Sequence, residues 1–194
     1  FIFPRYISEK LGHPDAIIDS WRLGSIDGDP VEYLKQNLSK KVFDDALVSH
    51  AAHTIGWNYE DGEIYDEYMA RGRSMFPEHD RQYATLIPTE QDWFSVSTDD
   101  APAACGYNTV EIPDGWLNDD QLTVSIESQS EDGAQFRAQV VSYAGDSFQY
   151  HNIDSSQPYS NIRVEPDSAL WLVVANVSTL GESPTPAEYR VSFL

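Results

Sequence analysis

Apolar residues change their spacing part-way along this chain, so a single fold must combine two kinds of structure. Before the stretch Ala101–Ile112 they largely recur every three or four positions, as on one face of a helix. After it, apolar runs alternate in twos, as in half-buried strands. We interpret this stretch as the joint between two halves that pack together. Because short β-type runs already begin after Gln82, we place a helical subdomain at residues 1–78 and a β-sandwich domain at 79–194.

Five helices are expected in the first part. Apolar positions at helical spacing, closed by glycine or proline, place them at residues 2–11, 14–24, 31–38, 39–57 and 62–75. In the second helix, Ile17, Ile18 and Trp21 are expected on one side, with Gly24 as the stop.

The longest of these helices carries a stripe of mostly apolar residues along one side. Asp44, Asp45 and Ser49 are expected to face away from that stripe. The stripe comprises Phe43, Leu47, Ala51, Thr54 and Trp57.

The second part has the pattern of an all-β domain, and the chain as a whole is therefore expected to be α+β. Its β-type runs correspond to about eight strands without an intervening helix, which favours an antiparallel sandwich with a jelly-roll arrangement. Leu170–Ala175 is apolar on both faces, so we expect a central strand there. The runs lie at 83–87, 93–96, 107–112, 122–126, 136–143, 148–150, 162–164, 170–175 and 189–193.

The chain is strongly acidic, which limits its partners. It has 32 acidic against 12 basic residues and a formal net charge of −20. This charge repels nucleic acid and anionic membranes, so neither is expected as a partner, whereas cations and basic surfaces are compatible. The acidity is equally explained as a means of staying hydrated in salty surroundings. No apolar run reaches about 18 residues, so no membrane span is expected.

The single cysteine and the first residues give two further expectations. Cys105 has no partner for an internal disulfide and no obvious basic neighbour, so we expect a buried structural thiol. The chain begins Phe-Ile-Phe-Pro-Arg-Tyr, without a methionine and with three large apolar residues among the first six. This opening is typical of a point inside a domain, so we expect a processed product or an excised fragment.

Two stretches resemble a known family. Ala-Pro-x-x-x-Gly-Tyr-Asn-x-x-Glu-Ile at residues 101–112 and Trp-Leu-Val-Val-Ala-Asn at 171–176 are similar to the carboxyl-terminal region of secreted bacterial zinc-peptidase-like proteins of the Svx type. The opening Phe-Pro-Arg-Tyr-Ile-Ser-Glu-Lys-Leu-Gly at 3–12 resembles the helix that follows their active site. The resemblance implies a gluzincin-like catalytic part first, then helices, then a β-sandwich. This chain contains no His-Glu-x-x-His motif, so neither the zinc ligands nor the general base of that family are assigned here.

Two groups of residues are candidates for metal binding. Asp27, Asp29 and Glu32 surround a glycine turn, as oxygen ligands do in a calcium loop, although a helix cap explains Asp29 equally well. Calcium is therefore the candidate cofactor. His50 and His53 are three residues apart on the longest helix, so they either share a metal ion or simply border the apolar stripe.

Aromatic residues of the sandwich could stack on sugar rings, or could fill the core and its edges. Trp116, Tyr150 and Tyr159 are the candidates for carbohydrate binding, and Tyr143 is a further member of the set.

The leading functional hypothesis is a non-catalytic carboxyl-terminal portion of a secreted metallopeptidase-like protein, with a stabilising, targeting or assembly role. Its partner would be the upstream portion of the same precursor or other copies of itself, in an extracellular location. The alternative is a self-standing extracellular module that binds polysaccharide or forms a polymer through its sheet edges. Because no complete catalytic motif is present, catalysis by this chain alone would need a site that no motif reveals.

Overall fold

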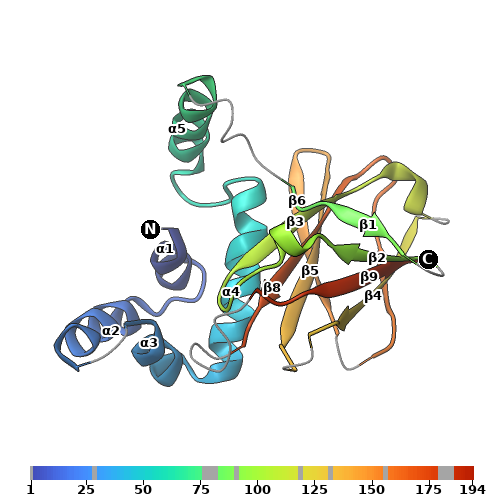
Figure 1. The fold of residues 1–194 in the computed structure, drawn as a ribbon. Helices are drawn as coiled ribbons and strands as arrows, with labels where there is room; N and C mark the ends of the chain where they lie inside the picture. Colours follow the sequence, from blue (N-terminus) through green and yellow to red (C-terminus); the bar gives the residue numbers. More distant parts are fainter. Residues whose placement is uncertain are drawn as a thin grey trace.

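The fold consists of a helical layer packed on one side of a β-sandwich (Figure 1). The computed structural model describes residues 2–27, 30–75, 83–89, 92–117, 120–130, 133–154, 157–178 and 186–194. Among these residues, no helix is long and apolar enough to cross a membrane. All five helices precede the strands in the described chain, and this confirms the expected α+β class.

The helices agree with the apolar spacing except at the end of the second one. Helix α2 continues past Gly24 to Asp27, because one glycine inside a helix costs only about 1 kcal/mol and does not by itself end it. The helices are α1 (Ile2–Glu9), α2 (Pro14–Asp27), α3 (Pro30–Leu38), α4 (Lys40–Ile55) and α5 (Gly62–Met75).

The strands form two antiparallel sheets, with the orders β1-β2-β9-β4-β7 and β3-β8-β5-β6. Strand β2 pairs with β9, β3 with β8, β4 with β7 and β5 with β6, so successive pairs are nested inside one another. This nesting is the jelly-roll topology, to which β1 adds an edge strand. The strands are β1 (Leu86–Pro88), β2 (Trp93–Val96), β3 (Tyr107–Ile112), β4 (Gln121–Ser128), β5 (Phe136–Ala144), β6 (Ser147–Ile153), β7 (Ser160–Arg163), β8 (Ala169–Asn176) and β9 (Tyr189–Phe193).

Strand β8 lies between β3 and β5, which confirms the central strand expected at Leu170–Ala175. Its apolar side chains are buried on both faces of the sheet. Leu172 and Val174 belong to the core between the sheets, whereas Val173 and Ala175 pack against α4. A strand covered on both faces has no polar side to present, and this explains the continuous apolar run.

The stretch Ala101–Ile112 is not a joint between two halves. Strands β1 and β2 precede it and already belong to the sandwich, and its second half is β3. Its first half is hydrogen bonded within the sandwich, since the amide of Asn176 donates to the Gly106 carbonyl over 3.0 Å and its side chain donates to the Pro102 carbonyl over 3.0 Å. The expected boundary at residue 78 falls outside the described residues.

Helix α4 is buried on two opposite sides, because it lies between the sandwich and the other helices (Figure 1). Leu47, Val48 and Ala51 face the four-stranded sheet, whereas Phe43 and Ala46 face α1 and α3. The expectation that Asp44 faces away from the core is wrong, since its side chain is only 3% exposed. A helix covered on both sides buries positions that a single apolar stripe would leave in water.

Candidate functional site

A cluster of two histidines and three tyrosines lies where α4, α1, the turn after α4 and the four-stranded sheet meet. We call it the His–Tyr cluster. The His53 ring stacks on the Tyr150 ring, with centroids 4.1 Å apart and planes 3° from parallel. The Tyr6 ring lies 5.3 Å from His53 and 6.1 Å from His50, so α1 covers both imidazoles. The cluster comprises Tyr6, His50, His53, Tyr59 and Tyr150.

Hydrogen bonds hold the imidazoles in defined orientations. His53 Nδ1 lies 2.8 Å from the carbonyl oxygen of Ser49, and since a carbonyl only accepts, Nδ1 carries the proton and Nε2 is the basic nitrogen. His50 Nδ1 lies 2.9 Å from the Tyr59 hydroxyl. Asn58 Nδ2 donates to the Tyr150 hydroxyl over 3.0 Å. The turn after α4 thus contacts both the helix and the edge strand β6.

Burial makes every titratable group of this cluster harder to charge. It lowers the pKa of His50 to about 4, with a smaller contribution from neighbouring His53. Burial also lowers the pKa of His53, although the hydrogen bond to the Ser49 carbonyl opposes this. The pKa values of Tyr59 and Tyr150 are raised by burial. The cluster is therefore neutral at pH 7.

Arg5 fastens α1 to α5 beside this cluster. Its guanidinium donates to the Tyr65 hydroxyl over 2.8 Å and to Asp61 over 2.7 Å, and it also contacts Glu9. These hydrogen bonds, first of all the one to Asp61, raise the pKa of Arg5 above its ordinary value. Glu9 in turn accepts from the backbone amide of Glu60 over 3.3 Å. One arginine therefore joins the first helix to the segment from 60 to 65.

A hollow of about 580 Å³ lies at the turn between α4 and α5. Trp57 and Phe148 form part of its wall, and Glu60, Asp61 and Asp66 line it with carboxylates. Because these acidic residues are exposed in an already acidic chain, the hollow by itself does not indicate a ligand.

Gly56 at this turn allows the close approach of β6. A Cβ added to Gly56 would lie 2.1 Å from Cζ of Phe148, so an alanine must displace a partly buried ring. We expect Gly56→Ala to lower the free energy of unfolding by about 1–3 kcal/mol, as other overpacked sites do. Gly115→Ala is the matched control, because nothing lies within 4 Å of its added Cβ. Urea unfolding of both variants measures the difference, and equal stabilities would contradict the packing argument.

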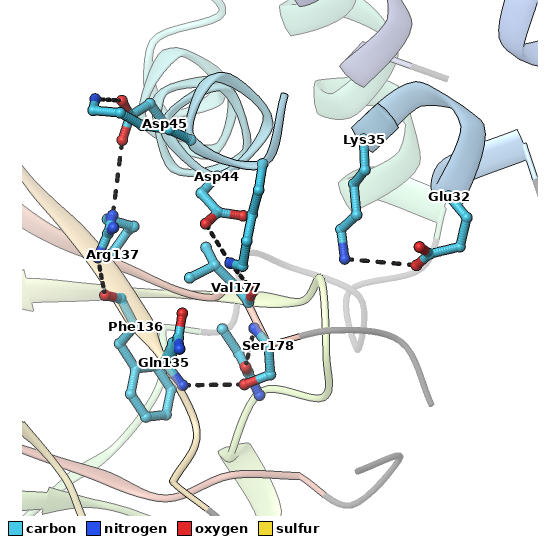
Figure 2. A network of polar contacts seen from close by, with 12 residues as sticks. Glu32, Lys35, Asp44, Asp45, Gln135, Phe136, Arg137, Val177 and Ser178 are labelled. Carbon is cyan, nitrogen blue, oxygen red and sulfur yellow. Dashed lines mark hydrogen bonds and ion pairs between the residues drawn. The ribbon is translucent and has the colours of Figure 1, made fainter. Parts of the chain in front are cut away.

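A second polar network surrounds the amino-terminal part of α4 (Figure 2). Lys40 Nζ lies 2.6 Å from the Asp44 carboxylate and 3.3 Å from the Val177 carbonyl, so it joins α4 to the segment after β8. Figure 2 shows Asp45 above Arg137 of β5, and the two side chains approach to 3.8 Å. The network therefore holds the helix on the sandwich.

Of the three proposed calcium ligands, the structure describes the side chain of Glu32 alone. Glu32 lies in the first turn of α3 with one carboxylate oxygen 3.7 Å from Lys35 Nζ (Figure 2). An adjacent ammonium disfavours a cation there. Asp27 is the last residue of α2, and its side chain, like the whole of Asp29, lies outside the described residues.

The histidine pair is brought together as the spacing predicted, but its surroundings are aromatic. His50 and His53 share the cluster with tyrosine rings, and their Nδ1 atoms face Tyr59 and Ser49. Within the described part of the chain, no three residues of the types His, Cys, Asp and Glu come together in a group that could hold a metal ion.

The carbohydrate candidates lie in different environments. Trp116 packs into the core between the sheets, 5.1 Å from the Phe94 ring and 5.5 Å from the Phe193 ring. Tyr150 lies on the other face of the four-stranded sheet, stacked on His53 under the helical layer. Only Tyr159 is exposed. These three residues therefore do not form one stacking surface.

The sequence did not indicate that apolar side chains of α2 and α5 are exposed. Ile17 packs toward the helical core, whereas Ile18 is 62% and Trp21 is 52% exposed. All three lie within an arc of about 100° on α2, as the spacing predicted, but of the three only Ile17 packs against the helical core. On α5, Ile64 and Tyr68 are exposed and four residues apart, so they lie on the same face. The two helices project from the helical layer at its opposite ends (Figure 1).

Comparisons with known proteins give one family and one distant structural likeness. A model described as "Family of unknown function (DUF6055)" matches residues 1–179, which include every described helix and strand except β9. No curated protein matches the chain. Among solved structures, the crystal structure of the Yersinia pseudotuberculosis-derived mitogen is similar with 10% sequence identity and a TM-score of 0.35. That alignment covers 57% of this chain and 85% of the mitogen chain.

Proposed function

The chain belongs to the family of unknown function DUF6055, and we propose that it is a non-catalytic docking module of a secreted peptidase-like protein. In this proposal the jelly roll is the stable base and the helical layer is the contact surface. The occupant of that surface is the peptidase-like part of the same precursor. The resemblance of residues 3–12 and 101–112 to such proteins suggests this occupant.

The observation that carries the proposal is the exposure of Ile18 and Trp21. Both are exposed and lie three residues apart on α2, beyond the edge of the face at which Ala16 and Ile17 pack toward the helical core. Isolated apolar residues are common on surfaces, but a tryptophan beside an isoleucine is typical of the centre of a protein contact. Burying both side chains would contribute roughly 3–5 kcal/mol to docking before the costs of association.

The exposed face of α5 supports the same role. Ile64 and Tyr68 are exposed there, and α5 is fastened to the rest of the chain through Arg5 and the stack of Trp57 on Tyr65, whose centroids are 5.7 Å apart. Apolar residues on both α2 and α5 would let one partner contact the helical layer at two places.

Separate production of the two parts tests this proposal. The segment that the gene encodes before Phe1 is produced alone and titrated with this chain by calorimetry. We expect a complex with the wild-type chain, and at least a tenfold weaker one with Trp21→Ser, because the substitution removes the largest apolar contact.

The matched control is Tyr159→Ser, which removes an equally exposed aromatic residue from the sandwich and should leave binding unchanged. A gene without a peptidase-like segment before Phe1, or equal affinities for wild type and Trp21→Ser, would overturn the proposal. Self-association that is lost in Trp21→Ser would identify a second copy as the occupant instead.

A further inference from the structure

We propose that the His–Tyr cluster is an acid-sensitive latch: protonation of His50 and His53 releases α1 and the α4–α5 turn from α4 while the sandwich stays folded. This inference concerns regulation of the helical layer and does not depend on what docks there. It rests first on position, because the two imidazoles lie at the contact that the latch would open.

The contact between α1 and α4 passes through both histidines. The Phe3 ring lies 5.2 Å from His50, and the Tyr6 ring lies 5.3 Å from His53. The turn after α4 adds Tyr59, whose hydroxyl meets His50 Nδ1 at 2.9 Å. Charging either ring would place an imidazolium among aromatic side chains that have displaced water.

The groups that face the imidazoles do not compensate such a charge. They are Tyr6 from α1, Tyr59 from the turn, Tyr107 from β3 and Tyr150 from β6, with Lys10 just after α1. The tyrosines are neutral in acid, Lys10 is positive, and each protonated histidine repels the other. Burial, Lys10 and the mutual repulsion of the two rings therefore oppose protonation, and the Ser49 carbonyl offsets this only in part at His53.

The face of α4 that contacts the four-stranded sheet is mainly apolar. There Val48, Ala51 and Ala52 pack on the four-stranded sheet without charge. The charged groups at this contact, the Asp44–Lys40 pair and the Asp45–Arg137 pair, lie in the amino-terminal part of α4, away from the two histidines. Acid therefore weakens the attachment of α1 and the turn to α4 more than the attachment of α4 to the sandwich. An opened latch would expose Tyr6, Ile7 and Phe43, which are buried in the helical core.

The direction of the pH dependence follows from linkage. The pKa of His50 is about 4 in the folded state and near 6.5 when the residue is unfolded, so the folded state binds fewer protons between these values. The stability of the latch is thus complete above pH 6.5 and is lost as the pH falls toward 4. From well above pH 6.5 to well below pH 4, His50 alone changes the closing equilibrium by roughly 300-fold in total, and the lowered pKa of His53 adds to this.

Hydrogen exchange of the whole chain, corrected for the intrinsic pH dependence of exchange, tests the latch. Between pH 7 and pH 4.5 we expect the amides of α1 and of residues 56–61 to lose protection by at least thirtyfold, while those of β8 keep it. In the double variant His50→Gln/His53→Gln the loss should shift to lower pH. His13→Gln is the matched control, because His13 is exposed and should leave the wild-type profile unchanged.

Two results would overturn the inference. One is a simultaneous loss of protection in α1 and β8, which would mean that acid unfolds the chain as one unit. The other comes from the wild-type chain and needs no variant to fold: nuclear magnetic resonance titration that finds His50 protonating at its ordinary pKa would remove the cause of release.

Discussion

Replacing Phe43 by alanine is expected to lower the free energy of unfolding by about 3–5 kcal/mol, one of the two largest effects predicted for this chain. The ring is fully buried in the helical core. It meets the Phe3 ring edge-on with centroids 5.6 Å apart, and Lys35 Nζ lies 5.3 Å from its centroid. Truncation therefore removes apolar contacts, an aromatic pair and a cation–π contact together.

Urea unfolding followed by far-ultraviolet circular dichroism measures this effect, since the signal is dominated by the helices. The matched control is Val42→Ala on the same helix, where the side chain is exposed and the change should stay within about 0.5 kcal/mol. A loss below about 1 kcal/mol for Phe43→Ala would show that α1 and α3 do not depend on α4 for their attachment.

The architecture could be predicted from local patterns wherever one face of an element is buried. Strands β2 and β3 begin and end at the residues that alternation indicated, and β8 was recognised as central because its run is apolar on both faces. The nested pairing of β2 with β9 and β3 with β8 joins residues about 60 to 100 positions apart, and no local pattern encodes this directly. The jelly roll was inferred from strand number and spacing instead.

Local sequence patterns could not predict which sides of a helix are covered by neighbouring elements. Helix α4 has one apolar stripe by sequence, but the structure covers it on two sides, and so Asp44 is buried. Similarly, Ile18 and Trp21 were expected to pack because they are apolar, whereas more than half of each residue's surface is exposed in the structure. A residue's type predicts burial only on average, because the neighbouring elements decide which sides of a helix are covered.

The sequence predicted the two histidines of the candidate site but not their tyrosine partners. The spacing of His50 and His53 placed both imidazoles on one side of α4, which the structure bears out. Their partners Tyr6 and Tyr150 come from residues about 45 positions before and 100 positions after, and only the fold brings them together. The sequence signal that could have found them is the high tyrosine content, eleven residues in 194, although it does not say which tyrosines meet.

Lys40→Met is expected to lower the free energy of unfolding by about 2–3 kcal/mol. It leaves the Asp44 carboxylate, only 3% exposed, without the ammonium that lies 2.6 Å away, and leaves the Val177 carbonyl without that donor. Removing one partner of a buried pair strands the other charge, which costs up to 3–5 kcal/mol in a fully buried pair. The cost here is smaller because the Lys40 side chain is 49% exposed, so water can reach the site.

Lys41→Met is the matched control for this prediction, since Lys41 makes the same contact with Asp45 at 2.6 Å, one position further along the helix. That lysine is 81% exposed, so its loss should change the stability by less than about 0.5 kcal/mol. The double variant Lys40→Met/Asp44→Leu should recover most of the lost stability, because no charge is then left buried. Urea unfolding of the four proteins completes the comparison. If Lys40→Met and Lys41→Met were equally mild, water would already solvate Asp44, and its ion pair would position α4 on the sandwich without stabilising it.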